Sequence, residues 1–188
     1  APYTRPMSDF IAETTALLER TPQVLRALLA GLPDGWTDTP DTADGWRPRE
    51  VVEHLIGAEE EEWLPRTRRI LEEGTSRAFD PFDRFGMLAR DADVPLDALV
   101  ERFAQLRAES LAALAALVSD ADLDRRGLHP SLGEVTLREL LSTWAVHDLD
   151  HVAQIYAGLA GSHDAAVGPW KAFLGILLRR DDPAAIPG

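Results

Sequence analysis

The sequence predicts an all-α protein in which four long helices form a bundle and a short helix follows at the C-terminal end. Leucine, alanine, isoleucine and valine recur at spacings of three and four residues through these segments. Glycine and proline gather between the segments, and no period-2 run of β-branched residues occurs. Because each amphipathic helix exposes one apolar stripe that must be covered, a helical bundle is the expected architecture.

Five segments carry the helical pattern. The expected helices span residues 8–32, 48–73, 95–118, 136–160 and 169–179. Ser8 is a good N-cap for the first helix, and Pro22 is expected to kink it. Pro48 suits the first position of the second helix, in which Pro65 should cause a bend near residues 58–64.

The later elements have signals of their own. Leucine and alanine repeat at helical spacing through the third helix. Thr136 and Glu139 form a Thr-x-x-Glu capping box that starts the fourth helix. The remaining segments are predicted to be loops or, at the C-terminal end, a frayed tail: residues 33–47, 75–94, 120–135 and 181–188.

Length, charge and composition bound the class of protein. A chain of 188 residues is long enough for one well-packed domain and short for two, so residues 1–188 are expected to form a single domain. Acidic residues outnumber basic ones by 32 to 19, which disfavours nucleic acid as a partner because phosphate binding relies on Lys and Arg. No apolar run approaches the roughly 20 residues that span a bilayer, and no basic segment with an apolar stretch opens the chain. We therefore expect a cytoplasmic protein with no membrane partner.

Two histidines fall on the apolar face of the fourth helix. At about 100° per residue, His147 and His151 lie inside or at the edge of the stripe that contains Leu141 and Trp144. A neutral imidazole buried among leucines still has two ring nitrogens to satisfy. Histidines at i and i+4 suit two ligands of one metal ion. A hydrogen-bonded pair in the core, or chance, would give the same spacing.

A third histidine lies on the second helix. His54 falls at the edge of the apolar arc, within about 60° of Val51. If the second and fourth helices pack as neighbours, His54 can approach the other pair. Because the chain has no cysteine, a metal must be held by His, Asp or Glu. Three histidine nitrogens would leave a fourth position for water, as in catalytic zinc sites. A hydrogen-bonded core cluster is the alternative.

Carboxylates near these histidines are the catalytic candidates. Asp148 and Asp150 flank the ligands, and a carboxylate that accepts the free N–H of a ligating histidine would fix its tautomer. Simple exposure to solvent is the alternative, above all for Asp150. Glu59 and Glu62 fall within the apolar arc of the second helix, where ion pairs with arginines of another helix are favoured over a catalytic role. Asp148, Glu62 and Glu59 are therefore candidates without an assigned step.

Other polar and aromatic residues are expected to be structural. His129, beside Pro130, is predicted to be structural or exposed rather than a fourth ligand, and His163 is predicted to lie on the surface. Four tryptophans could line a pocket, although packing in the core is the default for each: Trp46, Trp63, Trp144 and Trp170.

Several stretches of the sequence resemble the DinB/YfiT-like superfamily. They are residues 45–55, 129–136, 144–155 and 167–170. The resemblance runs over nearly the whole chain, and the order and spacing of the three histidines fit the family's pattern. It implies an up-down-down-up four-helix bundle in which His54, His147 and His151 bind a divalent metal, typically zinc or nickel, in a pocket open to solvent.

The resemblance also implies a range of functions. Family members are often homodimers, and characterised relatives include transferases and isomerases that use a low-molecular-weight thiol such as mycothiol or bacillithiol. Many others are described as metal-dependent hydrolases. The expected function is therefore a metal-dependent hydrolase or thiol-dependent transferase that acts on a small molecule. The alternative is a non-catalytic metal-binding or stress-related bundle, or a dimeric interaction module that uses the helix containing Trp170.

Overall fold

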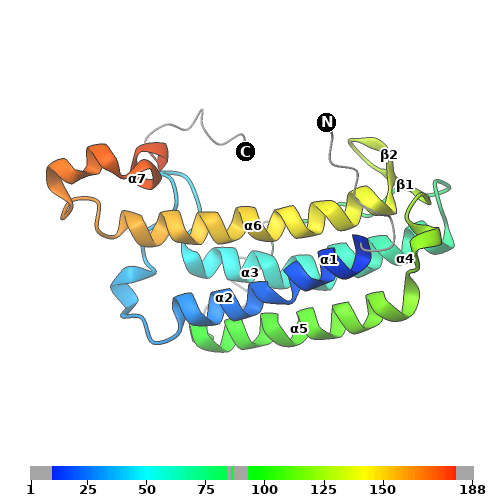
Figure 1. The fold of residues 1–188 in the computed structure, drawn as a ribbon, viewed down its shortest axis with the longest axis horizontal. Helices are drawn as coiled ribbons and strands as arrows, with labels where there is room; N and C mark the ends of the chain where they lie inside the picture. Colours follow the sequence, from blue (N-terminus) through cyan, green and yellow to red (C-terminus); the bar gives the residue numbers. More distant parts are fainter. Residues whose placement is uncertain (1–9, 84–85, 87–92, 181–188) are drawn as a thin grey trace.

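Helices make up most of the protein in the computed structural model, which describes residues 10–83, 86 and 93–180 (Figure 1). The α-helices are α1 (Phe10–Leu18), α2 (Arg20–Leu29), α3 (Pro48–Ala58), α4 (Leu64–Glu72), α5 (Leu96–Leu117), α6 (Leu137–Gly161) and α7 (Gly175–Arg180). A π-helical turn, η3 (Glu59–Trp63), joins α3 to α4. The predicted N-cap Ser8 and the predicted tail, residues 181–188, lie outside the described residues.

Four rods form the bundle: α1 with α2, α3 through η3 to α4, then α5, then α6. Along the colour gradient of Figure 1, the first rod and α6 run in one direction, while the second rod and α5 run in the opposite direction. The first rod packs against α5 and α6, and α3 also packs against both. The up-down-down-up bundle is therefore confirmed, and α3 and α6 are neighbours.

Proline shapes the first two rods. The first rod is interrupted at Glu19, between α1 and α2, although the backbone of Glu19 is itself helical. Pro22 lies in the first turn of α2 and cannot donate to the carbonyl of Leu18, four residues earlier, which agrees with the expected irregularity. Pro48 begins α3 as predicted. The predicted bend near Pro65 is the π-helical turn, whose wider backbone relieves the clash between a proline ring and the carbonyl four residues earlier.

The connection between α5 and α6 differs from the prediction. Residues 120–135 were expected to be a loop, and this is wrong, because β1 (Arg126–His129) and β2 (Gly133–Thr136) form an antiparallel hairpin. Each strand has only four residues, too few for a clear alternation of apolar and polar side chains. Gly127 allows the hairpin to pack closely on α4, since a Cβ atom there would lie 2.7 Å from Cγ1 of Ile70.

The fourth predicted helix begins as expected, whereas the fifth differs from the prediction. The capping box of α6 is confirmed, with the backbone N–H of Glu139 donating to Oγ1 of Thr136 at 3.2 Å and the backbone N–H of Thr136 donating to Oε2 of Glu139 at 2.7 Å. The helix expected at residues 169–179 is instead a 3-10 segment, Gly168–Phe173, followed by the short α7.

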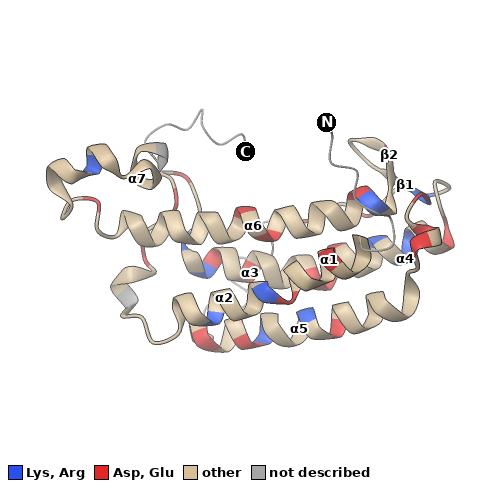
Figure 2. Ribbon diagram, viewed as in Figure 1, with Lys and Arg blue, Asp and Glu red and all other residues tan. Residues whose placement is uncertain are grey.

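Charges are spread over the surface of the bundle. Figure 2 shows Lys and Arg scattered between Asp and Glu along the described helices rather than gathered on one element. Among the described residues, no helix combines the length and the apolar character that crossing a membrane requires.

Candidate metal centre

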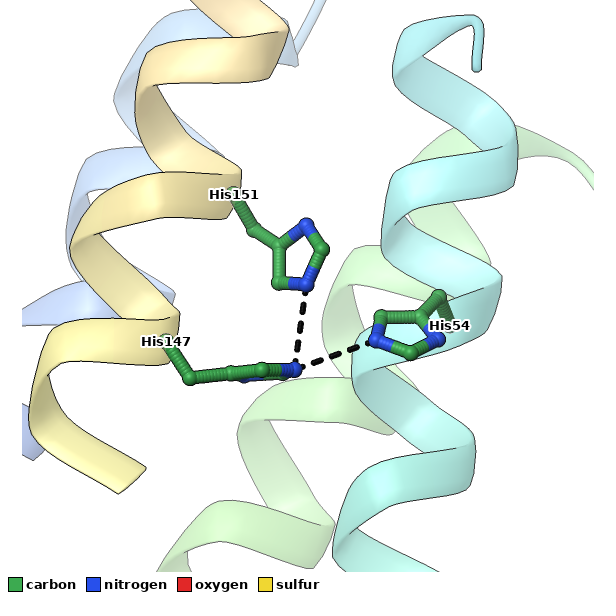
Figure 3. Close-up of side chains that lie close together, drawn as sticks. All are labelled: His54, His147 and His151. Carbon is green, nitrogen blue, oxygen red and sulfur yellow. Dashed lines mark hydrogen bonds between the residues drawn. The ribbon is translucent and has the colours of Figure 1, made fainter. Parts of the chain in front are cut away.

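The three histidines converge between two neighbouring helices. His54 projects from α3, and His147 and His151 project from successive turns of α6 (Figure 3). Nε2 of His147 lies 3.1 Å from Nε2 of His54 and 3.0 Å from Nε2 of His151. One ring nitrogen from each residue can be chosen so that all three lie within 4.8 Å of one another. Packing of α3 against α6 thus brings together residues that the sequence places on separate helices.

The donor set and its spacing fit a divalent transition-metal ion. Two nitrogens bound at about 2.05 Å to one tetrahedral ion are about 3.3 Å apart, a few tenths of an ångström more than the two distances from Nε2 of His147. His54 and His151 are 5% and 8% exposed, so the site is largely shielded from water. Burial lowers the pKa of His151 below its ordinary value, because the charged imidazolium is poorly solvated there. The neutral ring that results is the form that binds metal.

A chain of hydrogen bonds orients His151. Nδ1 of His151 lies 2.5 Å from Oε1 of Gln154, and since an amide oxygen only accepts, the proton resides on Nδ1 and Nε2 is available to a metal. Nε2 of Gln154 donates to Oδ2 of Asp41 at 3.1 Å, and Oδ1 of Asp41 accepts from the backbone N–H of Trp46 at 2.9 Å. The chain ties α6 to the loop that precedes α3.

Sequence reasoning missed both Gln154 and Asp41. Gln154 could have been found, because it lies three residues after His151 and therefore on the same face of the helix. Asp41 gives no comparable signal. Its position depends on how the loop folds back over α6, and it is only 3% exposed.

Aromatic rings surround the histidine cluster. The ring centroid of Trp46 lies 4.8 Å from that of His54 and 6.2 Å from that of His151. Trp63 meets His147 edge-on at 5.0 Å, and Phe82 lies 5.5 Å from His54. Such an apolar shell limits the access of water and strengthens electrostatic interactions inside it.

Trp144 and Trp170 have different surroundings from Trp46 and Trp63. Trp144 is completely buried and stacks on Trp63 with a centroid distance of 5.6 Å, as expected for the core. Trp170 is 71% exposed, so the expectation that it packs in the core is wrong. It belongs to the 3-10 segment, which lies beyond the four rods.

All three carboxylate candidates bind an arginine, and Asp148 and Glu59 share the same one. Both oxygens of Asp148 accept from Arg107, at 2.5 and 3.0 Å, so the carboxylate bonds to a guanidinium and not to a histidine ring. Oε1 of Glu59 accepts from Nε of Arg107 at 2.9 Å. Burial raises the pKa of Glu59, and the guanidinium of Arg107 opposes that shift. Glu62 forms an ion pair with Arg66 at 2.6 Å within its own rod.

The remaining polar residues lie where the sequence placed them. Nδ1 of His129 accepts from the backbone N–H groups of Ser131 and Leu132, both at 3.2 Å, so this histidine shapes the hairpin turn. His163 and Asp150 are exposed. Asp150 also lines a surface cavity of about 450 Å³ that opens beside His147, together with Ser142, Thr143 and Val146. Of the three histidines, His147 is therefore the one that borders this surface hollow.

Comparison with known proteins identifies the family. The family model of the DinB superfamily matches residues 17–155, a stretch that contains all three histidines. The chain belongs to the DinB superfamily. Membership of this family agrees with the topology of the bundle and with the order and spacing of the three histidines.

Several DinB relatives carry a functional description. Proteins of Bacillus cereus strain AH820 and Bacillus anthracis strain A0248 are each 24% identical to this chain over 154 residues, with 81% of this chain and 88% of the relative covered. Each is described as a "putative metal-dependent hydrolase". Among solved structures, YfiT from Bacillus subtilis matches with a TM-score of 0.72 and 24% identity over 86% of this chain and 91% of that chain. YfiT is described as "a probable metal-dependent hydrolase with an unusual four-helix bundle topology", so the DinB fold is shared.

Proposed function

We propose that this DinB protein is a metal-dependent hydrolase of a small molecule, with a zinc or nickel ion bound by His54, His147 and His151. The observation that carries the proposal is the convergence of three histidine nitrogens. His147 also borders a surface hollow. The descriptions of the relatives support the reaction class.

The residues of the site have separate tasks in this proposal. A divalent ion with three nitrogen ligands acts as a Lewis acid and lowers the pKa of a water or thiol held at its remaining position. Gln154 keeps His151 in the tautomer that presents Nε2. Trp46 and Trp63 shield the imidazole rings. The cavity beside His147 gives a small substrate its path to the ion, and Thr143 and Asp150 offer polar groups along it.

A thiol-dependent transferase is the second candidate. The chain has no cysteine, so any thiol chemistry would need a low-molecular-weight thiol as cosubstrate. The cavity of about 450 Å³ has room for part of such a molecule beside His147. In this alternative the same three histidines hold the ion, and only the nucleophile differs.

Activity screens separate the two reactions. Protein loaded with zinc or nickel is assayed against small esters and amides, and against electrophiles with and without mycothiol or bacillithiol. Turnover without thiol supports the hydrolase, and turnover only with thiol supports the transferase. Either activity should disappear in His147→Ala. A protein that binds metal and turns over none of these substrates would favour the non-catalytic alternative.

We also propose that the protein forms a homodimer. Exposed apolar side chains lie together on the C-terminal segment, where Trp170 and Phe173 are 71% and 81% exposed and their ring centroids are 6.3 Å apart. Apolar groups gathered in this way are common at protein interfaces. Light scattering should give twice the mass of the chain, and a monomer would contradict the proposal. A cytoplasmic location remains a prediction from composition.

A further inference from the structure

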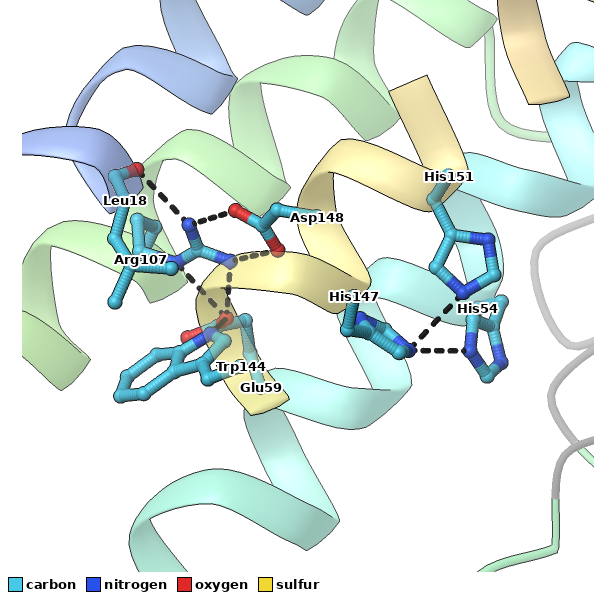
Figure 4. Close-up of polar contacts among 8 residues, drawn as sticks. All are labelled: Leu18, His54, Glu59, Arg107, Trp144, His147, Asp148 and His151. Atoms are coloured by element: carbon cyan, nitrogen blue, oxygen red, sulfur yellow. Dashed lines mark hydrogen bonds and ion pairs between the residues drawn. The ribbon is translucent and has the colours of Figure 1, made fainter. Parts of the chain in front are cut away.

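A buried arginine connects all four rods of the bundle. The side chain of Arg107, on α5, is 1% exposed. Its Nη1 donates to the backbone oxygen of Leu18, the last residue of α1, at 2.9 Å. It also binds Glu59 in η3 and Asp148 in α6, as Figure 4 shows. The side chains of Glu59 and Asp148 are 1% and 0% exposed, so the whole group is removed from water.

The two carboxylates lie close in sequence to the three histidines. Glu59 follows His54 by five residues along the continuous helical rod of α3 and η3. Asp148 follows His147 directly and precedes His151 on α6. In Figure 4, the arginine group and the histidine cluster lie on opposite sides of the same stretch of α6. Each rod that supplies a ligand is therefore anchored to Arg107 within about one or two turns of that ligand.

The contacts to Arg107 are directional. Asp148 binds its two terminal nitrogens at 2.5 and 3.0 Å, a forked arrangement that fixes the angle between the groups. Glu59 accepts from Nε of Arg107 at 2.9 Å and from Nε1 of Trp144 at 3.1 Å. The arginine also lies over the ring of Trp144, with Cζ 5.2 Å from the ring centroid. A small rotation of α6 or of η3 would break several of these bonds at once.

Stability alone is a poor reason for such a group. A buried ion-pair group repays its desolvation only in part, and apolar residues of similar volume often serve stability as well or better. In some proteins, buried polar groups with directional bonds fix the register between helices more sharply than apolar packing alone does. In this bundle the register of α3 against α6 decides whether Nε2 of His54 meets Nε2 of His147.

We propose that Arg107 is a positioning residue of the metal centre. Through Glu59 and Asp148 it fixes the rod that carries His54 against the α6 turn that carries His147 and His151, so that the three nitrogens converge on one ion. The inference rests on the proposed metal-binding function, and it adds a residue that touches none of the ligands.

Two variants test this role, and two controls accompany them. Arg107→Lys keeps the charge and loses the fork. A triple variant, Arg107→Met with Glu59→Gln and Asp148→Asn, removes every charge of the group and should fold, because no unpaired charge remains buried. Arg102→Lys is the matched control, since Arg102 also lies on α5 and pairs with Glu60 of η3 at 2.6 Å, but with 40% of its side chain exposed. Leu99→Ala, at a fully buried position of the core, controls for loss of stability.

The readouts are zinc affinity by competition with a chromophoric chelator and the visible absorption spectrum of the cobalt(II) form, each with circular dichroism to verify folding. We expect both Arg107 variants to bind zinc about 10- to 100-fold more weakly than wild type and to change the cobalt spectrum. Arg102→Lys and Leu99→Ala should keep the wild-type affinity and spectrum.

The possible outcomes separate this inference from the function on which it rests. Folded Arg107 variants with wild-type affinity and spectrum would overturn the positioning role and leave the metal site intact. An equal loss of affinity in Leu99→Ala would overturn it too, because general destabilisation would then explain the effect. A wild-type protein that binds neither zinc nor cobalt would overturn the proposed function and this inference with it.

Discussion

His54 and His147 are 93 residues apart in the sequence, and their Nε2 atoms lie 3.1 Å apart in the fold. This contact depends on the topology, because α3 and α6 are side by side only when the second and fourth rods of the bundle are neighbours. His147 and His151 could be paired from sequence by their spacing on one helix. The third ligand becomes part of the site only through tertiary structure.

The hydrogen bond between Gln154 and His151 should contribute to metal affinity. Gln154→Leu removes the acceptor that holds the Nδ1 proton, so His151 would lose its fixed tautomer and orientation. Zinc affinity is expected to fall by about 10-fold or more, as is usual when a partner of a metal ligand is lost. Competition with a chromophoric chelator measures the zinc affinity of each protein. Gln105→Leu, at an exposed glutamine bonded to Glu109, is the control and should bind zinc as wild type does. Equal affinities for all three proteins would contradict the role of Gln154.

Gly158 should resist a substitution that normally stabilises helices. In an open helix, Gly→Ala gains about 1 kcal/mol. At Gly158 a Cβ atom would lie 2.8 Å from the backbone oxygen of Thr39 and 3.2 Å from Cδ of Pro48, so the loop would have to move. We expect Gly158→Ala to destabilise the protein by about 1–3 kcal/mol. Urea denaturation shows whether the free energy of unfolding falls or rises. Gly35→Ala is the control, since a Cβ atom at Gly35 meets nothing within 4 Å. A more stable Gly158→Ala protein would show that the contact is loose.

Removal of Asp148 should be costly. Asp148→Ala leaves the guanidinium of Arg107 buried with one carboxylate fewer. Loss of one partner from a buried ion pair costs about 3–5 kcal/mol, which corresponds to a fall in Tm of roughly 10 °C for a chain of this size. Calorimetry measures the shift. Glu101→Ala, which breaks an exposed pair with Arg26, should change Tm little. Similar Tm values for the two variants would mean that the buried group is weakly coupled to folding.

The capping box of α6 should make stability depend on pH. The pKa of Glu139 lies below its ordinary value, because the N–H and Oγ1–H of Thr136 donate to its carboxylate. A pKa lowered by folding stabilises the protein above the unfolded-state value of about 4.3, and this contribution is lost as pH falls through the folded-state value. Glu139→Gln should therefore be less stable than wild type at pH 7, and the difference should shrink as pH falls below the unfolded-state value of about 4.3 and through the folded-state pKa. Urea denaturation at several pH values tests this, and a constant difference would contradict it.

The parts of the fold that sequence predicted well are those set by one residue's local chemistry. Pro48 starts α3 because its fixed φ and missing N–H suit a first helical position, and Thr136 starts α6 because its hydroxyl satisfies a free backbone N–H. The hairpin was missed because its strands are too short for a periodic signal, and one of them contains Gly127. The π-helical turn has no periodicity of its own, although Pro65 marked its place.

In the candidate site too, some residues could be predicted from the sequence and others could not. Its ligands could be predicted because histidines on an apolar helix face need partners, whereas Arg107 was overlooked. A signal for it exists: Arg107 falls four residues after Phe103 and four before Leu111, within the buried face of α5. An arginine in such a stripe indicates a buried ion pair. Which carboxylates it meets depends on the packing of three other rods, and this cannot be read from one helix.

The metal content of the purified protein tests the central claim most directly. Protein prepared without chelator and loaded with zinc or nickel is desalted and analysed by inductively coupled plasma mass spectrometry. We predict about one ion per chain in wild type and in His163→Ala, whose histidine is exposed, and a large loss in His54→Ala, His147→Ala and His151→Ala. Folded wild-type protein that retains no metal, or histidine-cluster variants that retain as much as wild type, would contradict the account.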